Sequence, residues 1–218
     1  MGEAAIRYIK RDYSTWTALG PGGLPSNPFG WVVTTILRAF KRPDPLTVRG
    51  ASNSSNTWTL EPRLAPRPFI APHPVPHRQL SGHSTPSLIH QIGGVIADEA
   101  RRNDSLLHLG RSRLERRGDA LYLSDPSLAD PNISRTQCEI AHVHGSDGSL
   151  HVVMTEDDAQ TVISAGWGEL HPLAGRPLIG LPESYVLIYA PTSDHEVNCI
   201  AHIVRRAVHT ACITGPCQ

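Results

Sequence analysis

Two runs of strand-forming residues flank a tight-turn signal in the second half of this chain. The runs cover residues 139–144 and 149–154, and each is rich in β-compatible side chains. Residues 146–148 between them read Ser-Asp-Gly, a combination typical of turns. We therefore predict a β-hairpin over residues 139–154 with a four-residue loop.

This hairpin determines which histidines meet. With a loop over residues 145–148, His142 pairs with His151, and directly opposed residues have Cβ atoms about 5 Å apart. Side chains alternate across a strand, so His144 shares the face of His142 and Glu139 points the other way. The pattern predicts a triangle of three histidines on one face. His171 follows a predicted helix, and we expect it to return to the same patch.

A histidine cluster of this kind has three interpretations, and the sequence leaves them open. His142, His144 and His151 could bind zinc, iron or copper. One or two of the histidines could instead act as general base and acid in a cofactor-free pocket. In the third interpretation they form a structural hydrogen-bonded set. Glu139 either orients an imidazole or pairs with a nearby arginine (Arg135, Arg111 or Arg113).

The rest of the second half predicts the fold class. Helical patterns cover residues 86–102, 155–165 and 193–212. Residues 106–124 have the pattern of two strands, and residues 185–190 have the pattern of one more. Strands joined by hairpins favour an α+β fold, an antiparallel sheet with a central β-hairpin and helices on one side. Three aromatic residues near these strands are candidate substrate contacts: Trp167, Tyr185 and Tyr189.

The first half is irregular and rich in proline. We predict an N-terminal helical segment over residues 1–46, with helices near 5–19 and 29–40, and a Pro/Ser-rich loop region over 47–86 with one strand near 57–60. The α+β domain then spans residues 87–215. The apolar face of the 29–40 helix packs on the core or rests on a membrane surface.

The histidines of the loop region receive no role. His73, His77 and His83 lie among prolines and small polar residues, where side chains usually face solvent. We therefore expect all three to be exposed.

Composition excludes several classes of protein. Lys and Arg number 20 and Asp and Glu number 20, so the formal net charge is zero, which argues against a nucleic-acid partner. The apolar runs are too short to span a bilayer, and the N-terminus lacks the apolar core of a signal peptide. The four cysteines show no metal-type spacing and fit a reduced intracellular setting, although Cys212 and Cys217 could form a disulfide. The sequence also lacks dinucleotide, P-loop and nucleophile-elbow motifs, so we expect no organic cofactor.

Several motifs resemble one known family. They are Glu-Ile-Ala-His-x-His at 139–144, Leu150-His151, Gly-Trp-Gly-x-x-His-Pro-Leu-Ala-Gly at 166–175, and Tyr-Ala-Pro at 189–191. Together they resemble the fungal luciferase family, the group of the luminous-mushroom enzyme. The resemblance covers most of residues 10–215 and is strongest over 138–192.

The resemblance implies a fungal protein. The luminous members of that family oxidise a hydroxylated α-pyrone, 3-hydroxyhispidin, with O2 and no known organic cofactor, and a strained peroxide then releases CO2 and light. Similar proteins of fungi that do not glow often belong to specialised metabolism. This chain differs from the luminous members in its loop region and in its low aromatic content of 6%. Those members begin with a hydrophobic membrane anchor, whereas Met1 here lies only a few residues before the matching region, so we expect a difference at this end as well.

We therefore predict an enzyme of fungal specialised metabolism acting on a small polyketide- or terpenoid-like substrate. The reaction is either cofactor-free oxygenation, with O2 as co-substrate, or a cyclisation or pericyclic step. His142, His144, His151 and His171 supply acid–base chemistry. The alternatives are a non-catalytic carrier of a metabolite intermediate and a light-emitting α-pyrone luciferase. We expect an intracellular location, in the cytoplasm or in peripheral contact with the cytoplasmic face of a membrane.

Overall fold

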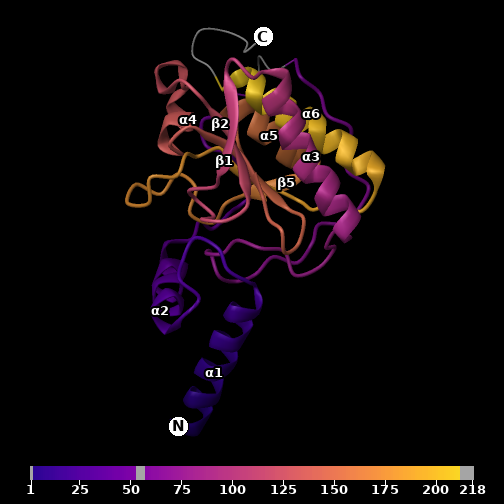
Figure 1. Cartoon of the computed structure of the whole chain (residues 1–218). Helices are drawn as coiled ribbons and strands as arrows, with labels where there is room; N and C mark the ends of the chain where they lie inside the picture. Colours follow the sequence, from indigo (N-terminus) through magenta and orange to yellow (C-terminus); the bar gives the residue numbers. More distant parts are fainter. Residues whose placement is uncertain (1, 53–56, 212–218) are drawn as a thin grey trace.

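The computed structural model describes residues 2–52 and 57–211. Within these ranges the chain forms six α-helices, two 3-10 turns and six strands (Figure 1). The helices are α1 (Gly2–Ala18), α2 (Pro28–Leu37), α3 (Pro86–Arg102), α4 (Pro131–Arg135), α5 (Glu156–Ser164) and α6 (Asp194–Thr210), and the 3-10 turns are η1 (Arg38–Phe40) and η2 (Pro126–Leu128). The strands are β1 (Leu107–Arg111), β2 (Asp119–Leu123), β3 (Glu139–Val143), β4 (Leu150–Val153), β5 (Gly168–Leu170) and β6 (Tyr185–Ile188).

The strands of the described chain make one antiparallel sheet in the order β1-β2-β3-β4-β6-β5. The predicted hairpin is β3–β4, and its register places His142 opposite His151 as expected. Its loop closes at Gly148, whose φ of 83° lies in the left-handed region that favours glycine. The predicted α+β class and the central hairpin are both confirmed.

Helices α3 and α6 lie side by side against one face of the sheet (Figure 1). Each begins where the sequence predicts, because Thr85 and Ser193 accept hydrogen bonds from backbone N–H groups of the first turn. Their apolar stripes pack on the sheet and enclose the core. Fully buried members of this core include Ile92, Ile96, Leu121, Leu150, Val152, Val186, Ile200 and Val204.

The N-terminal helices α1 and α2 extend away from the sheet (Figure 1). A small separate cluster of Trp16, Leu19 and Ala71 holds their inner ends together. Of the two alternatives for the apolar face of α2, packing on the core is wrong for Phe29, Val32 and Ile36, which are 68%, 45% and 59% exposed. The buried face of α2 instead carries Gly30 and Thr34. No helix of the described residues is long and apolar enough to cross a membrane.

The strand predicted near residues 57–60 is absent, and this stretch has no regular structure. Trp58 and Leu60 pack on the core by their side chains, without pairing with a strand at the sheet edge. The proline at position 62 also lacks the N–H that a strand would need. Cys212 and Cys217 lie outside the described residues.

Asp12 joins three N-terminal segments. Its carboxylate accepts hydrogen bonds from Trp31 Nε1 (2.8 Å) and Arg38 Nη2 (2.8 Å), and His73 Nε2 lies 3.3 Å away. Replacing Asp12 by Asn should weaken this junction by about 1–3 kcal/mol, since these hydrogen bonds involve a charged acceptor. Faster limited proteolysis of α1 would report the loss. Glu3→Gln on the same helix is the control, because Glu3 is 90% exposed, and equal proteolysis of both variants would contradict the prediction.

The same junction should depend on pH. Burial raises the pKa of Asp12, but hydrogen bonds from Arg38, Trp31 and His73 outweigh burial and hold it below the usual 3.8. A depressed folded-state pKa means that the stabilisation is present above the unfolded pKa and is lost as the pH falls through the folded pKa. The junction should therefore loosen only below about pH 4.

Candidate functional site

The face of the sheet opposite α3 and α6 carries the polar residues. Three of them stand on one row across β3, β4 and β5, because His142 pairs with His151, His151 with Leu187, and Leu187 with Glu169. Directly paired residues point to the same side of a sheet. His171 follows β5 and is 5% exposed on the same side, so the structure brings together all four histidines that the sequence singled out.

Glu139 also lies on this face, which corrects the prediction that it points away. The register between β2 and β3 shifts, so that Ala120 pairs with His142, Leu121 with Ala141, and Tyr122 with Glu139. The extra residue is accommodated as a β-bulge, which reverses the alternation of side chains. As a result Glu139 Oε1 lies 2.6 Å from His142 Nδ1. No ion pair with Arg135, Arg111 or Arg113 forms among the described contacts of Glu139.

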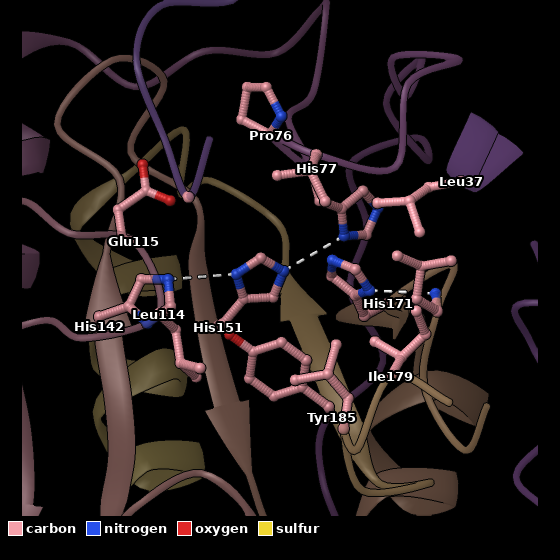
Figure 2. A pocket seen from close by; sticks show the side chains of 14 residues that line it. Leu37, Pro76, His77, Leu114, Glu115, His142, His151, His171, Ile179 and Tyr185 are labelled. Carbon is pink, nitrogen blue, oxygen red and sulfur yellow. Dashed lines mark hydrogen bonds between the residues drawn. The ribbon is translucent and has the colours of Figure 1, made fainter. Parts of the chain in front are cut away.

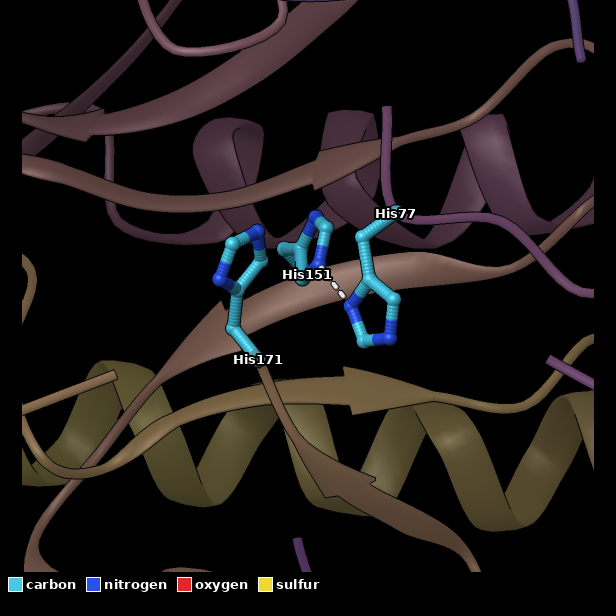
Figure 3. A group of neighbouring side chains, drawn as sticks. All are labelled: His77, His151 and His171. Atoms are coloured by element: carbon cyan, nitrogen blue, oxygen red, sulfur yellow. Dashed lines mark hydrogen bonds between the residues drawn. The ribbon is translucent and has the colours of Figure 1, made fainter. Parts of the chain in front are cut away.

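A fifth histidine comes from the proline-rich segment. His77 is 2% exposed and His73 is fully buried, so the expectation of solvent exposure is wrong for both, whereas His83 is exposed as expected. His77 Nδ1 lies 3.2 Å from His151 Nε2, and its ring meets that of His171 edge to face (Figure 3). The segment folds over the polar face because Asp147 of the hairpin loop accepts the Gln79 N–H at 3.1 Å.

The three hairpin histidines converge on one point. His144 Nε2 lies 3.1 Å from His151 Nδ1 and 3.3 Å from His142 Nε2, and the latter two nitrogens are 3.3 Å apart. All three rings are buried. We call these residues the histidine triad.

Each triad ring has a second partner on its far side. His142 meets Glu139, and His144 Nδ1 lies 2.8 Å from Ser149 Oγ, which donates its proton to Asp147 at 2.7 Å. His151 meets His77. Every imidazole of the triad is thereby held at both nitrogens, and its orientation is determined by contacts outside the triad.

Two of these partners lead to buried carboxylates. Glu139 also accepts hydrogen bonds from Tyr122 Oη (2.6 Å), Ser112 Oγ (2.9 Å) and the Arg113 N–H (2.8 Å). His77 Nε2 lies 3.8 Å from Glu169 Oε1. Glu169 is 3% exposed, and its other oxygen accepts hydrogen bonds from Arg67 and Tyr189.

A cavity of ≈ 200 Å³ opens beside this cluster (Figure 2). Its polar lining includes His77, His142, His151 and His171. The other lining residues are mostly apolar: Gly23, Leu37, Val75, Pro76, Leu114, Glu115, Leu173, Ile179, Leu181 and Tyr185. His144 is not among the lining residues. The site therefore combines an apolar chamber with imidazole nitrogens at one wall.

The three aromatic candidates have different surroundings. Tyr185 lines the cavity and stacks on His151 with ring centroids 4.6 Å apart. Trp167 and Tyr189 are absent from the described lining. Trp167 donates to the Glu61 carbonyl at 2.6 Å, and the Arg63 guanidinium lies over both rings. Tyr185 is thus the one of the three that lines the cavity.

Burial controls the charge of the cavity wall. It lowers the pKa of His151 and of His171 well below the usual 6.5, and the neighbouring histidines add to the effect. Burial also lowers the pKa of His77, against the opposing influence of Glu169. Burial raises the pKa of Glu169, but His77 and Arg67 outweigh it and keep this group a carboxylate. At neutral pH the imidazoles of His77, His151 and His171 are therefore neutral and carry a free lone pair.

Comparison with known proteins finds similarity to fungal luciferases. The luciferase domain pattern matches residues 137–207, which contain the whole histidine triad. The chain is also 29% identical over 217 residues to the luciferase of Armillaria mellea, covering 94% of this chain and 82% of the relative. The chain is thus similar to a fungal luciferase over nearly its whole length. The luciferase of Neonothopanus nambi is 29% identical over 221 residues, with 94% of this chain and 81% of that relative covered.

No solved structure matches this chain. Its site includes three groups that sequence reasoning missed. His77 and Glu169 lie far from the hairpin in sequence, and no local pattern connects them to it. The turn pattern explains Asp147 only as a loop residue. Its position three residues after His144 is the signal that could have predicted a contact with that ring.

Proposed function

We propose that this chain is an enzyme of fungal specialised metabolism that promotes the reaction of a small enolic molecule with O2. The substrate is polyketide- or terpenoid-like, and the reaction uses no organic cofactor. One observation carries the proposal: four buried histidines face a single, largely apolar cavity of ≈ 200 Å³. The match to proteins named luciferase supports oxygen chemistry in particular.

The geometry supports a simple division of tasks. An enol must lose a proton before its electron-rich carbon reacts readily with O2, and only an imidazole that is itself unprotonated can accept that proton. Burial keeps His77, His151 and His171 in that neutral form. The apolar lining excludes water and strengthens electrostatic contacts with the anion. Tyr185, stacked on His151, supplies a flat apolar surface for a planar substrate.

Oxygen uptake tests this function directly. Purified protein is mixed with hydroxylated α-pyrones, and O2 consumption, light emission and products are recorded with and without air. We expect protein-dependent O2 consumption. Product formation at the same rate without O2 would contradict oxygenation and favour the cyclisation or pericyclic alternative. Binding without any rate increase would favour a carrier of intermediates. Light emission together with O2 uptake would show that this chain has luciferase activity.

We also propose peripheral membrane contact through α2. Phe29, Val32 and Ile36 form an exposed apolar stripe, continued by Phe40 in η1. Full-length protein should sediment with liposomes, and Phe29→Asp combined with Ile36→Asp should abolish the sedimentation. Leu64→Asp is the matched control, because Leu64 is 94% exposed but lies elsewhere. Equal loss in the control, or no sedimentation of the unmodified chain, would refute the contact.

The proposal includes an intracellular location, in the cytoplasm or at the cytoplasmic face of a membrane. Cys138 and Cys199 are both free thiols and both buried. Free thiols are usual in reducing compartments.

A further inference from the structure

The distances within the histidine triad match those between the ligands of one metal ion. Three nitrogens about 2.0–2.1 Å from a tetrahedral zinc ion lie about 3.4 Å apart. Around an octahedral ion at a similar bond length the separation is about 3.0 Å. The triad separations of 3.1, 3.3 and 3.3 Å lie between these values. Small adjustments of the side chains would bring all three nitrogens into coordination.

The protons on the triad can be assigned from its outer contacts. His142 Nδ1 faces the Glu139 carboxylate, which only accepts, so Nδ1 carries the proton and Nε2 has a lone pair. Ser149 gives its hydroxyl proton to Asp147 and therefore accepts from His144 Nδ1. His144 Nε2 therefore carries no proton and also has a free lone pair.

His151 completes the set through the proline-rich segment. If His77 carries its proton on Nε2, toward the Glu169 carboxylate 3.8 Å away, then His77 Nδ1 accepts from His151 Nε2. That leaves the lone pair of His151 on Nδ1. Three lone pairs thus converge in a buried space with no donor among the described residues between them. One proton can bridge only one pair of these nitrogens, whereas one cation satisfies all three.

We propose that His142 Nε2, His144 Nε2 and His151 Nδ1 hold a divalent first-row transition-metal ion of the zinc or iron type. Neutral imidazoles suit such ions. His142 donates its other N–H to the Glu139 carboxylate, and His144 donates to Ser149, which donates to Asp147. His151 contacts His77 with its other nitrogen. Such contacts orient metal-bound histidines. Glu139, Ser149, Asp147 and His77 are positioning residues in this arrangement.

The ion has access to the cavity. Two of the three ligands, His142 and His151, line the chamber, so an ion bound by them would lie next to the space assigned to the substrate. Three protein ligands with an open position are typical of a catalytic site. The inference goes beyond the proposed function and does not depend on it, because metal binding can be measured without a substrate.

A second group of three histidines is a weaker candidate. His77, His151 and His171 also lie within reach of a common point (Figure 3). His171 Nδ1, however, accepts the Leu173 N–H at 3.0 Å, and a backbone contact at Pro74 engages the same ring. A metal there would have to displace these bonds. His171→Ala is therefore a matched control, since it removes a cavity histidine that the proposal does not use as a ligand.

Metal content of the full-length, untagged chain tests the site. We expect about one ion per chain by inductively coupled plasma mass spectrometry, and saturable Co²⁺ binding with a visible absorption band after chelator treatment. His144→Ala should lose both signals, and His171→Ala should keep both. Glu139→Gln should weaken Co²⁺ binding about 10–100-fold, as expected when a group that orients a ligand is changed.

A measurement on the unmodified chain covers the case in which His144→Ala fails to fold. X-ray absorption of the zinc-loaded protein should report three imidazole ligands. Fewer than three, or no saturable binding of Zn²⁺, Fe²⁺ or Co²⁺, would overturn the proposal. Loss of metal in His171→Ala with retention in His144→Ala would also overturn it, by placing the ion in the other group.

Discussion

Replacing His151 by alanine should lower the turnover of the enolic substrate about 1,000-fold, within the range seen for groups that take part in proton transfer. His151 is the central ring of the site. It contacts His142, His144 and His77 and stacks on Tyr185. Removing the His151 ring therefore eliminates one imidazole of the cavity wall. It also removes the contacts of His151 with His142 and His144 on one side and with His77 on the other. The effect is expected whether the triad holds a proton or a metal ion.

The measurement is kcat and KM from O2 uptake, with circular dichroism to establish that the variant is folded. His90→Ala is the matched control, because His90 is exposed on α3, away from the cavity. It should behave like the unmodified chain. A folded His151→Ala variant with undiminished turnover would show that the cavity is not where the reaction occurs. A change confined to KM would limit His151 to substrate binding.

The largest effect on stability should come from Glu139. Replacing it by alanine should reduce the free energy of unfolding by about 3–5 kcal/mol, the usual cost of removing one member of a buried charged network. The change removes the acceptor of the Ser112 hydroxyl. Tyr122 Oη then keeps only the Arg111 carbonyl as acceptor, and the Arg113 N–H keeps only Tyr122 Oη. Glu139 is 1% exposed, so water cannot readily replace the carboxylate.

Urea unfolding followed by fluorescence measures this difference. Glu139→Gln keeps the size of the side chain and one carbonyl acceptor, and it should cost about 1–3 kcal/mol. Glu3→Ala, at an exposed position, should change stability by less than about 0.5 kcal/mol. A Glu139→Ala variant as stable as Glu3→Ala would mean that the hydrogen bonds to this carboxylate contribute nothing to folding.

Local patterns predicted the hairpin and the helices around it correctly. The turn over residues 146–148 and the strand residues on either side determine the register, so the pairing of His142 with His151 follows from neighbours in the sequence. Helix α3 has the predicted bounds, and α6 begins directly after its predicted N-cap, Ser193. Caps and periodic apolar residues act within one or two helical turns, which is why they can be recognised without the fold.

The remaining site residues depend on contacts between distant segments. The bulge that turns Glu139 toward His142 arises from the pairing of β2 with β3. A regular alternation of side chains along β3 would place Glu139 on the face opposite to His142. His77 reaches His151 across 74 positions of sequence. Proline-rich composition predicts a loop but not whether it covers a sheet, since that depends on which surface the loop can bury.

The fold class, the hairpin and three converging histidines can be predicted from the residues alone, because each of these follows from short-range backbone preferences. The environment of those histidines depends on how distant segments pack: the carboxylate of Glu139 lies at one ring, His77 and Glu169 lie at another, and the cavity lies beside them. Burial and hydrogen bonds to distant residues set the charge and orientation of an imidazole, and neither can be read from the residues next to it.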